Sequence, residues 1–293
     1  MPAPRSKGFL TSDAVAIRNR YWLRRCLLTT GTQNLHALAR LVEPELAWKN
    51  DVSGQTSWPN KWRQFDAGRR SPRAALVDKV AEFDADGRDC RTTRTAYLSP
   101  LWEVMASTDL APRNLARWVG RLPQAVQRSF NSGGRTAAFA LESTRAPTLR
   151  RSDWNQLRRH AGLDALASLT LAFRLAIRAR QHDLVLDYGS WLVDMLHLLI
   201  PELSLHDVAL PMLTFYEEWV LPEAADASCW IYPSATAQAR IDFILHAAQL
   251  HRKSPASLSS LPADTQVVDK ILSGKRGPEV VIALRAVAGS SHP

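Results

Sequence analysis

Apolar residues recur every three to four positions through much of the second half of the chain, and this period constrains the fold more than any other feature. Two successive runs follow it, at Leu166, Leu169, Phe173 and Ile177, then at Leu184, Tyr188, Trp191, Leu192, Met195 and Leu199. A period near 3.6 places such residues on one side of a helix. Strand-like composition is confined to "EVVIAL" near Glu279. The sequence therefore predicts a mainly α protein.

The ends of these helices can also be predicted. Asp164 is placed to cap the first run, Arg174 and Arg178 share the face opposite its apolar side, and Pro201 comes just beyond the second run. A third helix is expected over 235–250. In the N-terminal half, the pattern predicts a helix over 14–28 that ends at Gly31, and a short one, "LHALARLV", that Asn34 caps.

Positive charge is concentrated in the N-terminal half. Residues 1–150 hold 24 Lys and Arg against 13 Asp and Glu, whereas residues 151–293 hold 13 against 15. Such asymmetry favours a polyanionic partner for the first half. Thirty of the 37 cations are arginine, whose fork suits phosphate, although a GC-rich genome gives the same bias.

Three cysteines, Cys26, Cys90 and Cys229, lie far apart, and no CxxC or Cys/His spacing suits a metal. This argues against a disulfide framework and a zinc site, and we expect a cytoplasmic protein with no metal and no cofactor. The most apolar stretch, 184–200, contains two aspartates and a histidine, which favours a buried helix over a membrane span.

Breaker-rich segments indicate how the chain divides. "DADGRDCRTTRT", residues 84–95, has no apolar period and is expected to be a loop, and 129–152 is a second such stretch. We therefore predict a basic region over 1–95 and a larger α-helical domain over 96–293, with a possible subdivision near 129–152.

The segment "NKWRQFDAGRRSP", residues 60–72, is the most informative for function. Its "FDAGRRSP" resembles the end of the recognition helix and the following turn in helix-turn-helix domains of the phage-repressor (xenobiotic-response-element) type. That resemblance assigns Phe65 to the core, Gly68 to the helix end and Pro72 to the start of the next helix. "LHALARLV" is similar to the family's earlier helix, but Ala39 lies 26 residues before Phe65, more than the compact family usually has.

This segment supplies the candidate binding residues. If it is helical up to Gly68, Trp62 and Phe65 share an inward face, and they are expected to be core and turn residues rather than ligands. Cations after the helix would meet phosphates, and polar side chains at its front would read bases. The predicted nucleic-acid-binding residues are Asn60, Lys61, Arg63, Gln64, Arg69, Arg70 and Arg73. The alternative interpretation is that these cations form an ordinary solvated face.

Other patterns carry weaker predictions. Trp22, Trp118 and Trp154 have arginine neighbours, so they could stack on single-stranded bases or serve as half-buried anchors. Glu217 and Glu218 are adjacent and diverge on a helix, so they are not expected to act as a catalytic pair. The sequence shows no catalytic motif, so no motif supports a third hypothesis, an enzyme that acts on nucleic acid.

Two functional hypotheses follow. The first is a DNA-binding regulator whose basic N-terminal region contacts duplex DNA and whose C-terminal region dimerises or binds a partner or effector. The second is a non-enzymatic α-helical adaptor in a bacterial stress or phage-defence assembly.

Overall fold

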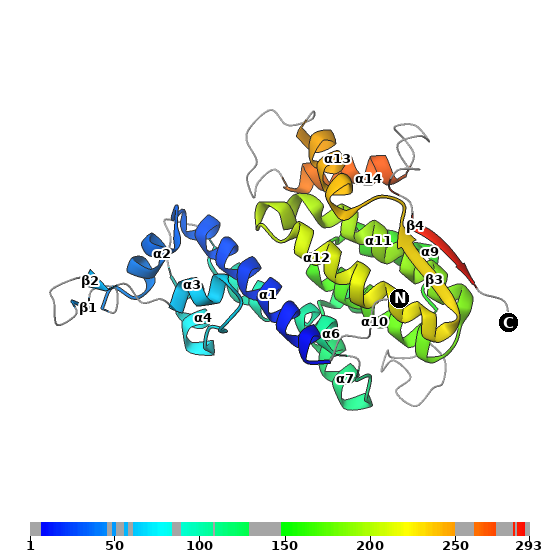
Figure 1. Cartoon of the computed structure of the whole chain (residues 1–293), viewed down its shortest axis with the longest axis horizontal. Coiled ribbons are helices and arrows are strands. Elements are labelled where there is room, and N and C mark those ends of the chain that lie inside the picture. The colour runs from blue at the N-terminus through cyan, green and yellow to red at the C-terminus, as the bar shows by residue number, and fades with distance from the viewer. Residues whose placement is uncertain are drawn as a thin grey trace. The chain divides into compact units, whose positions relative to one another are not determined.

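The chain divides into two compact units. Unit 1 comprises residues 1–98 with 206–208, and unit 2 comprises 99–205 with 209–293; the predicted boundary followed residue 95. The computed structural model describes residues 7–45, 49–50, 56–57, 61–83, 89–107, 109–128, 148–249, 261–273, 284 and 286–290, with the backbone alone at 7–11, 49–50, 56–57, 128 and 290. Both units are mainly helical, as the sequence predicts (Figure 1).

Unit 1 consists of one long helix and several short ones. Its elements are α1 Lys7–Thr30, α2 Leu35–Val42, β1 Lys49–Asn50, β2 Thr56–Ser57, α3 Lys61–Asp66, α4 Ala74–Ala81 and α5 Arg91–Tyr97. α1 begins well before residue 14, the predicted start. α5 corrects the prediction of a loop over 84–95, because 91–95 are helical; residues 84–88 lie outside the described part. The buried Thr93 and Ala96 show why: packing against α1 fixes a helix that lacks an apolar period of its own.

The predicted ends of the first two helices are confirmed. Gly31 follows α1 with φ 71°, a left-handed conformation that glycine adopts without strain. The Oδ1 atom of Asn34 accepts a hydrogen bond from the backbone N–H of Ala37 at 2.9 Å and so caps α2.

The core of unit 1 contains the aromatic residues that the sequence assigned to it. Trp62 and Phe65 are buried, and the Trp62 ring stacks on Trp22 with centroids 6.3 Å apart. Around them pack the buried residues Leu23, Cys26, Leu27, Leu38, Ala39, Val42, Val77 and Val80.

Glu43 explains how α2 and α3 can pack together although residues 43–60 separate them in sequence. One carboxylate oxygen accepts from Lys61 Nζ at 2.6 Å, and the other accepts from Trp62 Nε1 at 3.1 Å. The residue directly after α2 therefore binds the first two residues of α3. We call this contact the Glu43 clasp. The long spacing in sequence does not separate the two helices in space.

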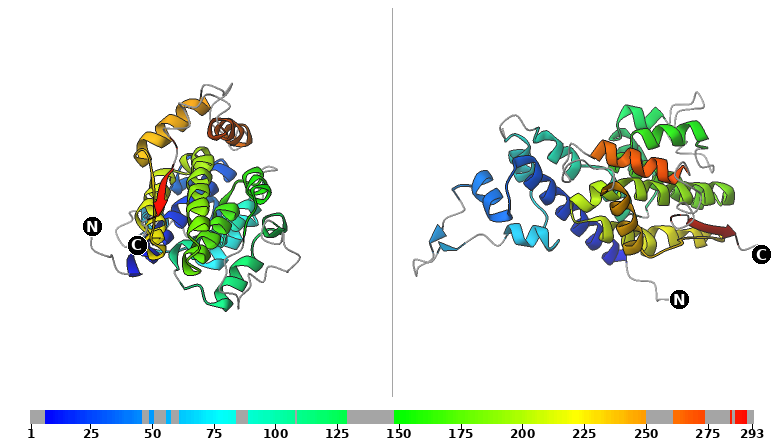
Figure 2. Two further views of the ribbon diagram at one scale, coloured as in Figure 1. Left: turned by 90° about the vertical axis from the view of Figure 1, so that its right-hand side faces the viewer. Right: turned by 90° about the horizontal axis from the view of Figure 1, so that it is seen from above.

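Unit 2 is built around two long helices, α10 and α11. Its elements are α6 Leu101–Ala106, α7 Pro112–Gly120, α8 Gln124–Arg128, α9 Arg151–Arg159, α10 Leu163–Arg178, α11 His182–Leu205, α12 Ala209–Phe215, a π-helical turn η1 Tyr216–Val220, a 3₁₀ turn η2 Leu221–Ala227, β3 Cys229–Pro233, α13 Ala237–Gln249, α14 Leu261–Leu272 and β4 Ala286–Ser290. α10 and α11 lie side by side, and α13 and α14 pack on α11 (Figures 1 and 2).

Three expectations for unit 2 need correction. Gly162, not Asp164, is the N-cap of α10; Asp164 lies in the first turn, where it accepts a hydrogen bond from Ser99 Oγ at 3.2 Å. Arg174 is buried rather than placed on a solvated face. Pro201 lies inside α11, which continues to Leu205, because the burial of Pro201 and Leu203 outweighs the lost backbone hydrogen bond.

A two-stranded antiparallel sheet in unit 2 was not predicted. β3 pairs with β4 in the register Trp230 with Gly289 and Tyr232 with Val287. Residues 229–233 alternate buried and exposed, but five residues are too few to give a clear signal. Most of the predicted strand "EVVIAL" lies outside the described residues.

α11 is long and apolar enough to cross a membrane by length and composition alone, and it is the one such helix in the described part of the chain. However, 67% of its most apolar window is buried inside the structure, as expected for a core helix.

Candidate nucleic-acid interface

The candidate interface is the bend that follows α3, residues 67–73. Gly68 has φ 70°, its N–H donates to the Phe65 carbonyl at 3.0 Å, and the Arg69 N–H donates to the Gln64 carbonyl at 2.9 Å. These two bonds around a left-handed glycine form a Schellman motif, which ends the helix and turns the chain. A side chain at Gly68 would also collide with α1, since its Cβ would lie 2.7 Å from Ala16 Cα.

Side chains from α1 and α5 hold this bend in place. The buried amide of Asn19 donates to the Arg70 carbonyl at 2.9 Å, and the Arg18 guanidinium donates to Ser71 Oγ at 2.9 Å. The Tyr97 hydroxyl donates to the Pro72 carbonyl at 3.2 Å. The backbone of 70–72 is therefore bonded to two helices. The bend is a fixed element on a packed core, with Pro72 buried beneath it.

Three predicted cations lie on this fixed bend with their side chains in solvent. Arg69, Arg70 and Arg73 are all exposed. Among the residues that the structure describes, no carboxylate forms an ion pair with any of them, whereas many other arginines of the chain have such a partner. These three positive charges are available to an external anion.

The remaining predicted residues do not all join this group. Lys61 is held by Glu43 in the Glu43 clasp, which diverts its charge from solvent. Gln64 is half-buried, and its carbonyl serves the Schellman motif. Arg63 is exposed and lines a hollow on unit 1 with Arg24 and Arg40. Asn60 lies outside the described residues.

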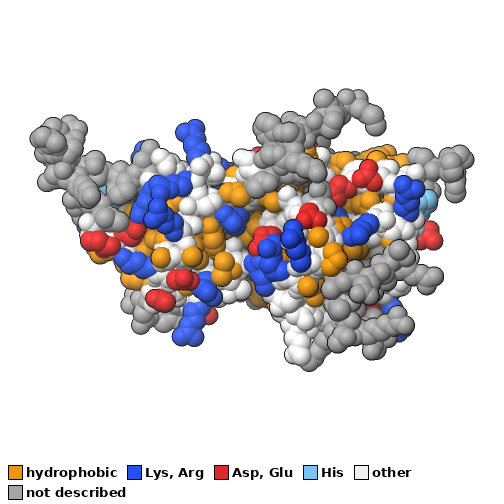
Figure 3. All heavy atoms as spheres, turned by 90° about the horizontal axis from the view of Figure 1, so that it is seen from below, with side chains coloured by type: hydrophobic (Ala, Val, Ile, Leu, Met, Phe, Trp, Pro, Cys, Tyr) orange, Lys and Arg blue, Asp and Glu red, His pale blue; other side chains and the backbone are white. Residues whose placement is uncertain are grey.

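Basic side chains do not form one continuous stripe on the face that Figure 3 draws. Lys and Arg side chains gather there in separate groups, with acidic and hydrophobic side chains between them.

The tryptophans with arginine neighbours are anchors rather than stacking platforms. Trp22, Trp118 and Trp154 are 0%, 1% and 5% exposed, so none presents a ring face to a single-stranded base. Trp154 instead stacks on Trp191 with centroids 5.4 Å apart.

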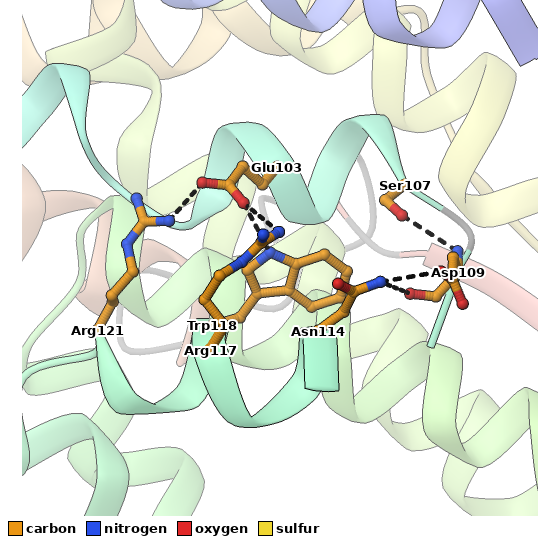
Figure 4. A network of polar contacts seen from close by, with 7 residues as sticks. All are labelled: Glu103, Ser107, Asp109, Asn114, Arg117, Trp118 and Arg121. Atoms are coloured by element: carbon orange, nitrogen blue, oxygen red, sulfur yellow. Dashed lines mark hydrogen bonds and ion pairs between the residues drawn. The ribbon is translucent and has the colours of Figure 1, made fainter. Parts of the chain in front are cut away.

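Trp118 belongs to a polar network that joins α6 and α7 (Figure 4). Glu103 on α6 accepts from Trp118 Nε1 at 3.1 Å, from Arg117 at 2.7 Å and from Arg121. Burial alone would raise the pKa of Glu103, but hydrogen bonds from Arg121 and Trp118 outweigh it, so that the pKa is lowered. This carboxylate is ionised and fully engaged in joining two helices.

Unit 2 also contains two buried arginines, each paired with a partly exposed glutamate. On α10, Arg174 binds both carboxylate oxygens of Glu223, at 2.8 and 2.6 Å, and donates to the carbonyls of Val104 and Ser107. The buried Arg240 joins Glu217 to His197, whose Nε2 lies 2.8 Å from the guanidinium.

The second of these pairs explains the role of Glu217, one of the two adjacent glutamates at 217–218. Burial, followed by the charge of Arg240, lowers the pKa of His197 to about 3, and burial lowers the pKa of Arg240 to about 10. His197 is therefore neutral at pH 7 and accepts a hydrogen bond from Arg240. Glu217 acts as the partner of a buried cation.

Among the described residues, no group of three or more His, Cys, Asp or Glu side chains is placed to hold a metal ion. No protein-family model, curated protein or solved structure matches the chain.

Proposed function

We propose that this chain is a cytoplasmic DNA-binding protein, with unit 1 as a divergent helix-turn-helix module that contacts duplex DNA. In this proposal the cations of the bend bind phosphates, and any contacts with base edges come from α3. The chain acts as a regulator rather than as an enzyme.

One observation carries this proposal. Arg69, Arg70 and Arg73 are exposed on a bend that α1 and α5 hold through hydrogen bonds, and no described carboxylate pairs with them. A phosphate backbone attracts such charges independently of base sequence. A fixed bend also loses little conformational freedom on binding, so less of the interaction energy is lost to ordering.

The helix arrangement gives secondary support. In a helix-turn-helix, two packed helices are joined by a short turn and the second one enters the major groove. Here the Glu43 clasp holds the end of α2 to the start of α3, so an insertion at the turn is compatible with such a pair. The Phe65 and Gly68 positions keep the roles that the resemblance assigned to them.

The test is electrophoretic mobility of a random-sequence duplex with the full chain at two salt concentrations. We expect binding at low salt that weakens steeply as salt rises, because each phosphate contact releases counterions. Absence of binding at low salt, or binding indifferent to salt, would overturn the proposal.

A matched pair of double variants locates the site. Arg69→Glu with Arg70→Glu should abolish binding at the low salt concentration while the far-UV circular dichroism spectrum stays helical. Arg151→Glu with Arg159→Glu changes two exposed arginines of unit 2 by the same net charge and should leave binding within about twofold. Equal effects of the two pairs would move the site away from the bend.

A second candidate function, a protein-binding adaptor, is favoured by one surface of unit 2. Trp230 and Tyr232 are 41% and 53% exposed and stack with centroids 5.3 Å apart on one face of β3. Aromatic residues of this kind are enriched where proteins meet. In this reading unit 2 dimerises or binds a partner in a bacterial stress or phage-defence assembly. A monomeric mass by light scattering, unchanged by Trp230→Ser, would rule out self-association through this surface.

A further inference from the structure

Unit 2 carries a hollow of about 570 Å³ beside the end of α10. Arginines of α10 and of the turn after it line the hollow together with carboxylates from η2 and from the segment just before α7. Leu110, Ala111 and Ile177 add apolar surface to the lining. The volume falls within the range of ordinary ligand sites. We call this feature the α10 hollow.

One pair of the lining charges is neutralised within the protein. Arg174 binds both carboxylate oxygens of Glu223, at 2.8 and 2.6 Å. The other four charged side chains of the lining are Asp109, Arg178, Arg180 and Asp226. None of these four forms an ion pair within the part of the chain that the structure describes. The α10 hollow therefore presents two positive and two negative charges that are balanced in number but not paired with each other.

Two of the four groups are held by hydrogen bonds to uncharged partners. The Asp109 carboxylate accepts from the Ala111 N–H at 3.0 Å and from the side-chain amide of Asn114 at 2.9 Å (Figure 4). Arg178 donates to the Leu110 carbonyl at 3.0 Å. These bonds position the two side chains without cancelling their charges. The side chains of Arg180 and Asp226 have no hydrogen bond to any described residue.

The backbone conformation of Arg180 is a second, independent observation. Its φ is 51°, and it follows α10 in a Schellman motif, in which the Gln181 N–H donates to the Ala176 carbonyl at 3.0 Å and the Arg180 N–H donates to the Ile177 carbonyl at 2.9 Å. Glycine is the usual residue at this position, because a side chain is strained in the left-handed region. An arginine here keeps a guanidinium group in the lining at a cost in stability, and such strained positions concentrate at ligand sites.

We propose that the α10 hollow binds a small zwitterion with an apolar side chain, either a free amino acid or a short peptide with both ends free. The planar fork of an arginine matches a carboxylate with parallel hydrogen bonds, and an ammonium group donates hydrogen bonds that carboxylates accept. A ligand with one charge of each sign satisfies groups of both kinds, whereas a ligand with a single charge leaves one kind without a partner. The apolar part of the lining favours an apolar side chain on the ligand.

The experiment titrates L-leucine, and separately L-leucyl-L-leucine, into the full chain by isothermal titration calorimetry without DNA. We expect saturable binding, and the zwitterion that binds more tightly identifies the ligand as an amino acid or a peptide. N-acetyl-L-leucine lacks the ammonium group and L-leucine methyl ester lacks the carboxylate, so each should bind at least about tenfold more weakly than L-leucine, as expected for the loss of a hydrogen bond to a charged group. No binding of either zwitterion, or equal affinity for the blocked forms, would overturn the proposal.

Substitutions locate the site. Arg180→Ala and Asp226→Ala should each weaken binding about tenfold. Arg159→Ala and Asp242→Ala remove exposed charges of unit 2 that do not line the α10 hollow, and they should leave the affinity unchanged. Equal affinity in all four variants would overturn the proposal.

Arg180→Gly separates binding from stability. Glycine removes the strain of the left-handed conformation, so the melting temperature should rise while zwitterion binding weakens about tenfold. A raised melting temperature with unchanged binding would overturn the role of Arg180 as a ligand contact. Because the α10 hollow lies in unit 2 and is tested without DNA, failure of duplex binding would defeat the proposed function and leave the zwitterion site standing.

Discussion

In unit 1 the arginines of the bend point into solvent, whereas unit 2 encloses Arg174 and Arg240 almost completely. Arg69, Arg70 and Arg73 have no carboxylate partner among the described residues. Arg174 and Arg240 are 3% and 1% exposed; each binds a glutamate, and Arg174 also donates to two backbone carbonyls and Arg240 to one. The same residue type is thus exposed and without a described carboxylate partner in one unit, and part of the internal architecture in the other.

This difference indicates at which positions the charge of an arginine affects the stability of the fold. A buried guanidinium requires partners, because leaving its glutamate without a counter-charge inside the protein is strongly unfavourable. An exposed one contributes little to folding and is free to serve binding. The predictions below test this division, from the largest expected effect to the smallest.

Replacing the buried arginine should have the largest effect. Arg174→Met removes the charge that pairs with Glu223 and the guanidinium donor of two carbonyls, so we expect a loss of about 3–5 kcal/mol in the stability of unit 2. Native-state hydrogen exchange with mass spectrometry measures this for each unit separately.

Two companion variants sharpen that result. Arg178→Met, one turn along α10 at an exposed position, should change the stability by less than about 1 kcal/mol. Arg174→Met combined with Glu223→Leu should recover part of the loss, since it removes both charges. If the double variant is no better than the single one, the carboxylate is not the source of the instability.

Low pH should destabilise both units, because each contains one buried histidine that resists protonation in the folded state. Burial lowers the pKa of His197 in unit 2 and of His206 in unit 1 to about 3, below the value of about 6.5 in an unfolded chain. Between those values the unfolded state binds a proton that the folded state does not. Stability is therefore complete above pH 6.5 and falls with pH, by about 2–3 kcal/mol per histidine at pH 4.5.

Urea denaturation at pH 7.5 and pH 4.5 measures this loss. His197→Gln, which keeps an acceptor for Arg240, and His206→Gln should each reduce the difference between the two pH values. His246→Gln alters an exposed histidine and should leave the difference as it is in the unaltered chain. An unchanged difference in both buried variants would assign the acid loss to carboxylates instead.

The bend offers an intermediate effect. Gly68→Ala forces a side chain into the left-handed region and against Ala16, so we expect a loss of about 1–3 kcal/mol in unit 1 and weaker duplex binding. Gly120→Ala is the matched control, because a Cβ at that position meets nothing within 4 Å, and it should be neutral or slightly stabilising. Similar losses in both variants would mean that the bend is not specially constrained.

The smallest effect concerns a single exposed cation. Arg70→Ala should leave the stability within about 0.5 kcal/mol of the unaltered chain, because its side chain has no described ion-pair partner. It should lower the slope of log affinity against log salt by about one, the loss of one phosphate contact. An unchanged slope would show that Arg70 does not contact the backbone.

Local signals in the sequence were enough to predict the helices and several of their ends. The period of Leu166 to Ile177 predicted α10, and Gly31 and Asn34 marked helix ends through their own backbone and side-chain chemistry. Such signals act within a few residues, so one sequence is enough to find them. The burial of Trp62 and Phe65 followed from the same reasoning.

What escaped prediction depends on partners distant in sequence. β3 and β4 pair across more than fifty residues, and Arg174 is buried because Glu223 meets it. At the candidate site, Lys61 was wrongly expected to be available for binding. Its partner, Glu43, lies 18 residues upstream, and no local pattern in the sequence indicates that the two side chains meet. The hollow on unit 1 that Arg24, Arg40 and Arg63 line collects arginines from three helices without any local motif.

The Glu43 clasp has a practical consequence for protein engineering. One carboxylate holds the end of α2 to the start of α3, so a side-chain contact sets the distance between those helices in addition to the chain that connects them. We expect residues 46–58 to accept replacement by a short glycine–serine bridge, or the grafting of a fluorescent reporter. The reporter would then precede α3 in the chain without redesign of the helices.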